Sequence, residues 1–361
     1  MRYFGSTILR VAVLFLAAGL SISCIKTSTN QKTARLLTSE NASQADLIKE
    51  VNRFARVNSM RAKMDLSFED NSFAEFGSKE VYRKADGEVV VQRPGKILLK
   101  VQVPVVRYDV AQMTSDGQMF RVAILQDGGT GKYKKFVKGT NNADYSRLQQ
   151  TLNVTDAGNG KVAKENVNAF ASLRPQHFTD AMLVRPTDEA HLYTQSTIFQ
   201  EEEDTTLEKK SPVRRVTRPY YLLDEFVKQS DGSLMIARRF WFDRVGTIRL
   251  ARQQIFDARG ELESDITYGK EGRLTTTGEY ANLPLEIQVT RIKEKYSMKL
   301  TYQTPEDVLI GHVFSDEAFI LKNSWNLEEV DLDQKLAEAR TQPLQPTTPA
   351  INTSVTKFRP E

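Results

Sequence analysis

Cysteine, histidine and tryptophan are scarce in this chain of 361 residues, which contains one, three and two of them. The single cysteine, Cys24, excludes an internal disulfide and a cysteine metal cluster. The histidines His177, His191 and His312 lack HExxH spacing, which argues against a zinc site and favours structural or surface roles. No GxSxG, Walker A or GxGxxG motif is placed for catalysis or phosphate binding. We therefore expect no enzymatic activity, no metal and no dissociable cofactor.

A strong charge of one sign and long apolar runs are also missing. Lys and Arg number 50 against 46 Asp and Glu, and the formal net charge of +4 is too small to indicate nucleic-acid binding. No segment reaches the 18 apolar residues expected of a membrane-spanning helix. With 40% hydrophobic and 27% charged residues, the composition is that of a globular body exposed to water.

The N-terminus carries the clearest signal. Arg2 and Arg10 precede an apolar core at residues 11–20. Ten helical residues span about 15 Å, half of a bilayer's hydrocarbon thickness, which suits a signal peptide better than a transmembrane helix. Ser21-Ile22-Ser23-Cys24 follows and resembles the lipobox of bacterial lipoproteins. The resemblance implies a signal peptide at 1–23 and a mature chain that begins at Cys24 with N-acyl and S-diacylglycerol groups. The alternative is an ordinary secretory signal that is cut elsewhere.

Such a modified cysteine would anchor the chain to a membrane, because each buried methylene group contributes ~0.8 kcal/mol and the residue carries several acyl chains. Ile25 follows Cys24, where an acidic residue would retain a lipoprotein in the inner membrane of enteric bacteria. By analogy we expect the outer membrane, facing the periplasm. Residues 24–43 are rich in Ser, Thr, Asn and Gln and are predicted to be a flexible tether. Residues 336–361 are predicted to be a disordered tail.

The body, residues 44–335, begins with a helix. Ser43 and Asp46 form a plausible N-terminal cap, and apolar residues recur at helical spacing over about 44–57. The period then changes to two, which predicts an antiparallel meander with one apolar face. Its predicted turns are Asp86-Gly87, Pro94-Gly95 and Ser115-Asp116-Gly117, since Gly beside Asp or Pro marks tight turns.

A helical insertion interrupts the meander at about 141–186, with its last helix predicted from His177 to Leu183. The glycines of Gly128–Lys132 are predicted to form a hairpin loop and not a phosphate-binding loop. Strands resume near 189–199, 217–229, 233–244, 247–257, 261–269, 284–292 and 296–303, and a short helix follows near 315–319. The charged run from Glu201 to Arg215 is predicted to be a solvated loop.

One strand mixes cations with aromatic residues. Because side chains alternate along a strand, Arg238, Phe240 and Phe242 should share one face, and Arg239 and Trp241 the other. The simpler interpretation is a strand buried on both faces with arginine stems packed along it. The alternative is a site for an anionic lipid headgroup.

Four segments with turn motifs are familiar: Val57–Met64, Tyr82–Gly87, Gln92–Ile97 with its RPGKI sequence, and Thr114–Phe120 with SDGQMF. They resemble the LolA/LolB-like superfamily of periplasmic lipoprotein carriers and outer-membrane lipoprotein receptors, over about residues 44–140. The resemblance implies an α+β fold, in which a curved antiparallel sheet forms an unclosed barrel and helices cover its concave face. It also implies an apolar hollow that holds acyl chains.

The first functional hypothesis is thus a non-enzymatic lipoprotein that binds acyl chains of lipids or lipoproteins and assists their transfer or localisation in the cell envelope. Its expected partners are the membrane, those acyl chains and other envelope proteins. The alternative is an anchored scaffold with a packed interior. The residues predicted to line the hollow, each of which fits a plain core position equally well, are Met64, Leu66, Phe68, Ile97, Leu99 and Val101.

Overall fold

The computed structural model describes residues 34–70, 80–103, 108–126, 134–143, 145, 148, 175–205, 207–211, 213–276, 280–293 and 295–341. The predicted signal peptide, Cys24, residues 25–33 of the tether, the loop at 128–132, most of 141–174 and the tail beyond 341 lie outside these ranges. The chain divides into two compact units. The smaller contains Met1–Leu37 and Gln200–Arg218, and the larger contains Thr38–Phe199 and Pro219–Glu361.

The larger unit begins with helix α2, Gln44–Ala55. The predicted cap is a full capping box, because the Ser43 side chain accepts from the Asp46 backbone N–H and the Asp46 carboxylate accepts from the Ser43 backbone N–H. Leu47, Val51 and Phe54 form its buried stripe. The helix ends two residues earlier than predicted.

The described strands form one 16-stranded sheet. The first series comprises β2 Ser59–Asp70, β3 Glu80–Gln92, β4 Lys96–Gln102, β5 Asp109–Asp116, β6 Met119–Ile124 and β7 Lys135–Thr140. The second comprises β8 Leu192–Glu203, β9 Arg215–Lys228, β10 Leu234–Asp243, β11 Arg249–Phe256, β12 Leu262–Leu274, β13 Tyr280–Arg291 and β14 Tyr296–Tyr302. The remaining strands are β1 Arg35–Leu36, β15 Leu309–Ile310 and β16 Glu328–Asp331.

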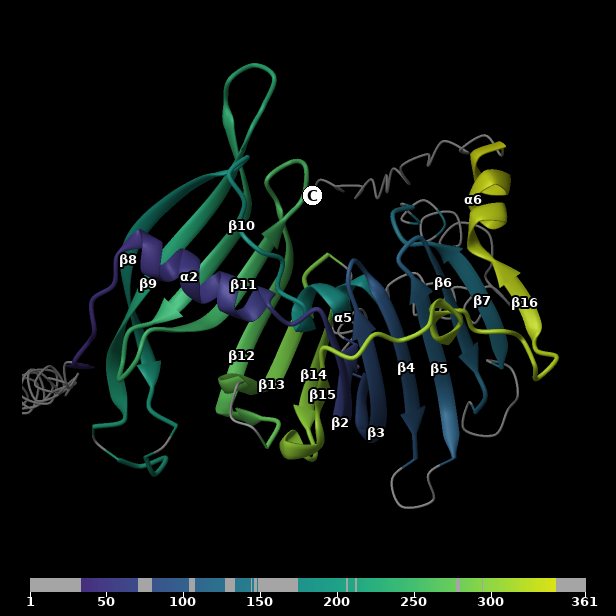
Figure 1. Cartoon of the computed structure of the whole chain (residues 1–361), viewed down its shortest axis with the longest axis horizontal. Helices are drawn as coiled ribbons and strands as arrows, with labels where there is room; N and C mark the ends of the chain where they lie inside the picture. Colours follow the sequence, from purple (N-terminus) through teal and green to yellow (C-terminus); the bar gives the residue numbers. More distant parts are fainter. Residues whose placement is uncertain are drawn as a thin grey trace, which may run out of the picture. The chain divides into compact units, whose positions relative to one another are not determined.

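The order of paired strands is β1-β9-β10-β11-β12-β13-β14-β2-β3-β4-β5-β6-β7-β16, with β8 beside β9 and β15 beside β2. Within the described residues this path has two ends and does not close on itself. Antiparallel pairs dominate, and the end pairs β1–β9 and β16–β7 are parallel. The predicted fold class, an unclosed sheet with helices on one face, is confirmed (Figure 1).

Helix α5, Pro175–Met182, shows how the sheet curves within the larger unit. The helix contacts β3, β4 and β5 on one side and β13 on the other, although β14 and β2 lie between them in the sheet. The sheet therefore bends around α5. We call the side that carries α5 the inner face. Phe54 of α2 packs on Tyr268 of β12 on this same face, with ring centroids 5.9 Å apart.

The predicted turn at Asp86-Gly87 is wrong, because β3 continues through both residues. Gly87 is needed there for space. A Cβ atom on Gly87 would lie 2.5 Å from Cδ1 of Leu66, whose side chain on β2 leans across the glycine. The turns at Pro94-Gly95 and Ser115–Gly117 are confirmed, and Gly117 has a φ of +99°, in the region that favours glycine.

In the smaller unit, β1 pairs with Val216 and Thr217 of β9. The charged run is not simply a loop, since β8 continues to Glu203 and β9 begins at Arg215. Ion pairs Glu203–Arg214 and Glu202–Arg218, at 3.0 and 3.3 Å, cross the hairpin. Surface pairs of this kind contribute at most about 1 kcal/mol each, so they add little to the stability of the hairpin.

The opposite face of the first series of strands is covered by residues 311–327, which follow β15 and cross this face as an extended segment (Figure 1). The short 3₁₀ helix η2, Pro305–Asp307, precedes the segment, and a second one, η3, Asp316–Phe319, lies within it. The Leu321 N–H donates to Oγ1 of Thr114 at 3.1 Å, and Phe319 is fully buried. This part of the sheet thus has packed layers on both sides.

The C-terminal helix α6, Leu332–Thr341, overlaps the first residues of the predicted tail. Leu336 and Ala339 are buried, and the helix packs beside β7. The spacing of Leu332, Leu336 and Ala339 is that of a helical stripe, and this signal was obscured by the polar residues around it.

Candidate functional site

The six residues predicted to line a hollow do meet on the inner face. In register, Met64 and Val101 both lie opposite Gly87, and Leu66 lies opposite Ala85. Met64, Leu66, Ile97 and Leu99 are buried, with Met64 and Ile97 fully so, while Phe68 and Val101 are partly buried. All six belong to, or pack against, the main apolar cluster.

Strand register arranges the inner face of β9–β14 into transverse rows. The row through Phe240 is apolar apart from Gln253 and consists of Leu223, Phe240, Gln253, Ile266, Val289 and Met298. The next row is apolar throughout and consists of Tyr221, Phe242, Leu250, Ile287 and Leu300. The row at the other side of Phe240 differs. It consists of Glu225, Arg238, Ile255, Ser264, Arg291 and Tyr296, which we call the polar row. The inner face is therefore amphipathic, with a polar end.

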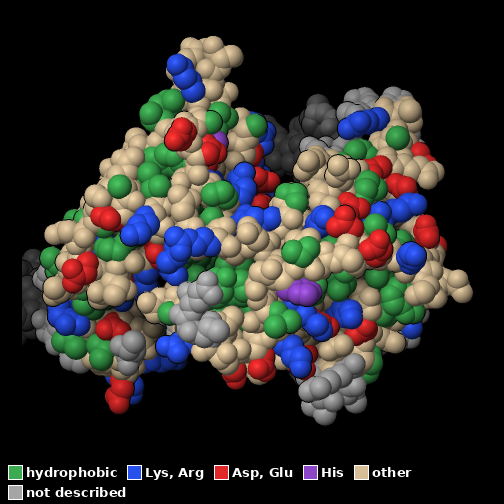
Figure 2. Space-filling view, in the orientation of Figure 1, with side chains coloured by type: hydrophobic (Ala, Val, Ile, Leu, Met, Phe, Trp, Pro, Cys, Tyr) green, Lys and Arg blue, Asp and Glu red, His purple; other side chains and the backbone are tan. Residues whose placement is uncertain are grey.

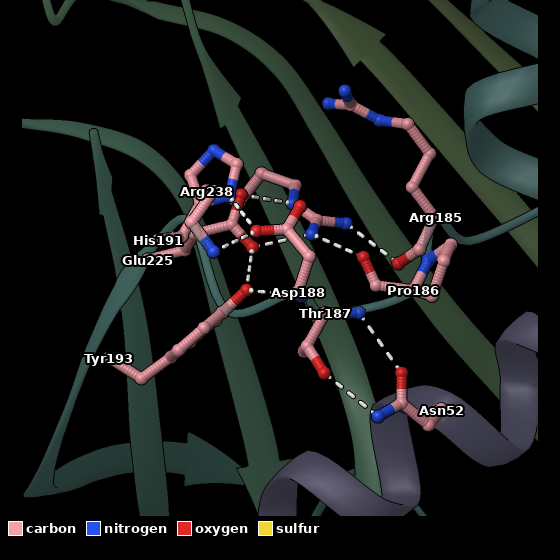
Figure 3. Close-up of polar contacts among 10 residues, drawn as sticks. Asn52, Arg185, Pro186, Thr187, Asp188, His191, Tyr193, Glu225 and Arg238 are labelled. Atoms are coloured by element: carbon pink, nitrogen blue, oxygen red, sulfur yellow. Dashed lines mark hydrogen bonds and ion pairs between the residues drawn. The ribbon is translucent and has the colours of Figure 1, made fainter.

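A buried ion pair dominates the polar row. Nε of Arg238 donates to Oε1 of Glu225 at 2.8 Å, and Nη2 donates to the other carboxylate oxygen (Figure 3). Both side chains are 3% exposed. Breaking such a pair is costly because it leaves one buried charge alone. The predicted alternation is confirmed, since Arg238, Phe240 and Phe242 are buried together while Arg239 and Trp241 are partly buried.

Two arginines also fix the chain that leaves α5. Arg238 donates to the carbonyls of Arg185 and Pro186 at 2.8 and 3.0 Å. Nη1 and Nη2 of Arg93 donate to the carbonyls of Leu183 and Val184 at 3.3 and 2.7 Å. Burial and the nearby Arg185 lower the pKa of Arg93 from its ordinary value.

Helix α2 holds the same segment a little further on. The Asn52 amide and Thr187 exchange two hydrogen bonds, at 2.8 and 3.0 Å (Figure 3). Tyr193 donates from its hydroxyl to Oε2 of Glu225 at 2.9 Å and accepts from the Asp188 N–H at 3.2 Å. Burial first, and then the Glu225 carboxylate, raise the pKa of Tyr193 to about 12. Residues 183–193 thus form a strap fixed at several points, and α5 lies at its N-terminal end.

Helix α5 packs on the inner face with Phe178, Ala181 and Met182 among its buried residues. Polar groups accompany them. Nδ1 of His177 lies 2.5 Å from the Tyr296 hydroxyl of the polar row, and Tyr268 donates to the Ala181 carbonyl at 3.2 Å. The interface between α5 and the sheet is consequently not a purely apolar one.

Asp180 is the acidic residue of this interface. Loss of water on burial raises the pKa of its carboxyl group, and Glu263 raises it further, whereas Arg185, Arg291 and Arg238 lower it without cancelling the rise. Burial and the nearby Asp180 likewise raise the pKa of Tyr268. The ionised form of the Asp180 side chain is thus less stable when α5 is docked on the sheet than it is in water.

Gln253 adds a further polar group to the inner face. It is 1% exposed, and its Oε1 has no hydrogen-bond partner among the described residues. Buried polar atoms without a partner are rare in folded proteins. This buried amide could not be predicted from the sequence, because Gln253 stands in an ordinary alternating strand.

Two of the surface grooves formed by the described residues can be compared with the predicted site, and neither is lined by the six predicted residues. One, of about 810 Å³, is lined by Tyr108, Asp109, Leu125, Gln126, Lys134, Trp325 and Leu327. The other, of about 340 Å³, lies along α2 and includes Lys49, Arg53 and Arg56, where Figure 2 shows Lys and Arg side chains gathered. Asp46 and Glu50 line the same groove, so its charge is mixed.

Sequence reasoning found Arg238 but missed Glu225, Arg291 and Asp180. The signal that could have found them is a charged residue at an inward position of an otherwise apolar strand, as at Arg291 after Val289 and Ile287. Within the described ranges, no group of three or more His, Asp or Glu side chains could hold a metal ion. No helix in the described part of the chain is long and apolar enough to span a bilayer.

No protein-family model matches the chain, and no curated protein matches it. Among solved structures, a LolA superfamily protein from Nitrosomonas europaea is similar, with 10% identity, a TM-score of 0.38 and coverage of 78% of this chain and 99% of that one. A DUF1329 family protein from Desulfovibrio piger is similar with 10% identity, a TM-score of 0.40 and coverage of 77% of this chain and 95% of that one. A Vibrio parahaemolyticus domain assigned to outer-membrane lipoprotein sorting is similar with 11% identity, a TM-score of 0.36 and coverage of 77% of this chain and 97% of that one. All three TM-scores lie below 0.5, so these likenesses assign neither a family nor a function to this chain.

Proposed function

We propose that this protein is a non-enzymatic, membrane-anchored lipoprotein that binds acyl chains on the inner face of its sheet, in the place that α5 occupies, and so assists lipid or lipoprotein transfer in the cell envelope. The observation that carries this proposal is the composition of the α5 interface. A large apolar face is covered by an eight-residue helix, and this helix also carries the partly exposed Asp180, whose carboxyl pKa is raised by burial.

The magnitudes favour exchange of the helix for a lipid. Burying Phe178 and Met182 contributes about 2–3 kcal/mol each, and the smaller residues of α5 contribute less. An acyl chain of about 16 methylene groups, at ~0.8 kcal/mol each, offers roughly 13 kcal/mol of gross burial. Desolvation of Asp180 opposes docking of the helix. An acyl chain can therefore outcompete α5 without unfolding the sheet.

The fixed strap gives the helix a defined hinge. Arg93, Arg238 and Asn52 hold residues 183–187 while α5 itself is joined to the sheet by few polar contacts. Movement of α5 about this strap would uncover β3–β5 and β13, which the helix contacts. These strands carry Ile97 and Leu99 on β4 and, on β13, Ile287 and Val289 of the apolar rows.

The proposed anchor is the acylated Cys24, with the outer membrane, facing the periplasm, as the proposed location. Cys24→Ser should abolish membrane association. Incorporation of labelled palmitate into the variant at the wild-type level would disprove the anchor. The same variant supplies a full chain without its own acyl groups for binding experiments.

Acyl-chain binding is tested by displacement of a neutral, polarity-sensitive naphthylamine dye from the Cys24→Ser chain with oleate and with oleyl alcohol. We expect saturable displacement by both at micromolar concentration. A matched control is Lys49→Gln on the exposed side of α2, which should leave displacement unchanged.

The alternative role, an anchored scaffold without a lipid site, is favoured by one observation. Met64 and Ile97, predicted to line the hollow, are fully buried in the main cluster. Absence of displacement by any acyl compound, together with no lipid in a native mass spectrum of the purified chain, would support the scaffold and exclude the carrier.

A further inference from the structure

The two ends of the sheet differ in how well they are protected against pairing with another strand. At one end, β16 has four residues, three of them acidic, and a short charged strand is a common way to keep a sheet edge from pairing. At the other end, β8 is the last long strand (Figure 1), and β9 is its only strand partner among the described residues. β8 has 12 residues, and none of them is buried.

Most of β8 lacks the residues that normally protect an edge strand. Residues 192–200 include no charged residue, no Pro and no Gly, although charged side chains and Pro are the usual protection. Five of these nine residues are Tyr, Thr, Ile or Phe, which favour strands. Leu192 and Phe199 are large apolar residues that are 49% and 58% exposed. A long, uncharged edge of this composition is suited to pairing with a further strand.

The start of β8 is held in place by contacts within the chain. Nε2 of Gln44 donates to the Tyr193 carbonyl, and Nε2 of Gln195 donates to the Ala42 carbonyl, both at 3.1 Å. The Tyr193 hydroxyl is bound to Glu225. A carbonyl oxygen has two lone pairs, so Tyr193 can still accept from a partner strand. Because the edge is already ordered, pairing costs little conformational entropy on this side of the interface.

We propose that β8 is a dimer interface, in which it pairs antiparallel with β8 of a second copy of this chain around a two-fold axis at Ser196. The distribution of charge favours self-pairing, because the acidic residues of β8, Glu201–Glu203, all stand at one end of the strand. Antiparallel pairing places the two acidic ends far apart, whereas parallel pairing would set like charges side by side. Such a symmetric interface is complete with two copies and does not extend into a fibre.

The position of the axis follows from the cross-strand pairs that it creates. With Ser196 opposite Ser196, Tyr193 of each copy lies opposite Phe199 of the other, and Thr194 lies opposite Ile198. Aromatic and β-branched pairs of this kind stabilise antiparallel strands. The Ser196 side chain is exposed and makes no hydrogen bond to any described residue, so it can be replaced with little effect on folding.

The test measures the molar mass of the full Cys24→Ser chain by sedimentation and light scattering between about 1 and 100 µM, where we expect a monomer–dimer equilibrium. Ser196→Lys sets two like charges on the axis and should raise the dissociation constant of the dimer about five-fold, as should Ser196→Glu. An equimolar mixture of these two variants should form a mixed dimer at least as tight as that of the unsubstituted chain. The neutral control Ser196→Gln should dimerise normally.

Cysteine cross-linking tests the position of the axis, because the Cys24→Ser chain has no other thiol. On mild oxidation, Ser196→Cys should form a disulfide-linked dimer more efficiently than Thr194→Cys or Ile198→Cys, since only residue 196 meets its own copy across the axis. Glu329→Cys on β16 is the control and should stay monomeric.

Four results would overturn the proposal: a monomer at every concentration, assembly beyond two copies, equal association of the Ser196→Lys and unsubstituted chains, or cross-linking at Glu329→Cys as efficient as at Ser196→Cys. A chain that stays monomeric but binds an extended peptide along β8 would assign the edge to a foreign strand instead. None of these measurements depends on acyl-chain binding, so they leave the proposed function to its own test.

Discussion

The inner face differs in polarity between its two halves, strands β2–β6 and strands β9–β14. In β2–β6 the inward residues are almost all apolar, and the other side of these strands is covered by the segment around Phe319. In β9–β14 the apolar rows end in the polar row, with the buried pair Arg238–Glu225 and with Arg291. The first half has the character of a folding core. The second half buries charges that a purely apolar core lacks, and these charges are paired.

Leu99→Asp should have the largest effect, because it tests whether the β2–β6 half is closed. Leu99 is 4% exposed and lies between Val89 and Met113 in register. A carboxylate there would be buried without a partner, at a cost of several kcal/mol, comparable with the stability of a whole domain. We expect loss of the cooperative thermal transition. A nearly unchanged Tm with lost dye binding would place Leu99 in an accessible hollow and show that the β2–β6 half is not a closed core.

Glu225→Gln tests the charged end. It leaves Arg238 buried without its carboxylate, so the free energy of unfolding should fall by about 3–5 kcal/mol. Urea denaturation gives this value. The control is the double variant Glu225→Leu with Arg238→Met, which removes both charges and should recover most of the loss. If the single and double variants are equally unstable, the charge of the pair is not what matters.

Gly87→Ala probes packing between β2 and β3. The new Cβ would lie 2.5 Å from Cδ1 of Leu66, so the strands must shift, and overpacking of this kind costs about 1–3 kcal/mol. Addition of Leu66→Ala makes room for the methyl group. The double variant should therefore be more stable than the sum of the two single effects predicts. Strict additivity would show that Leu66 does not lie across Gly87.

Asp180→Asn should have the smallest effect on stability and the clearest effect on binding. Because burial raises the pKa of Asp180, the docked state of α5 holds its proton more tightly than the free state. Docking is therefore favoured fully below the ordinary value of 3.8 and weakens as pH rises through the raised pKa. The asparagine variant mimics the protonated form, so its Tm at pH 8 should be higher by about 1–3 °C and acyl binding weaker.

The comparison with wild type across pH 4–9 isolates this residue from Glu263, Tyr268 and the three arginines that surround it. The difference in Tm between variant and wild type should grow as pH rises and vanish toward pH 4. A difference that is constant with pH, or that has the opposite sign, would contradict desolvation as the cause.

Much of the fold was predictable because its signals are local. The capping box at Ser43 and Asp46, the alternation that places Met64, Leu66 and Phe68 on one face, and the glycines of the hairpin turns all follow from neighbouring residues. The seven later strands were placed to within a few residues, with the largest shift at the end of β12, which was predicted at 269 and lies at Leu274. The turn at Gly87 was predicted wrongly because the sequence does not distinguish a glycine that makes room for a leucine on the next strand from a glycine that forms a turn.

The sequence by itself determined the strands, their faces and the helix that opens the body, since each depends on residues a few positions apart. Only the tertiary structure decided which inward residues meet. Glu225, Arg238 and Arg291 come from three strands, and Asp180 comes from a helix before all of them. Their proximity depends on strand register and on the bend of the sheet around α5, and neither is written in any short stretch of the chain.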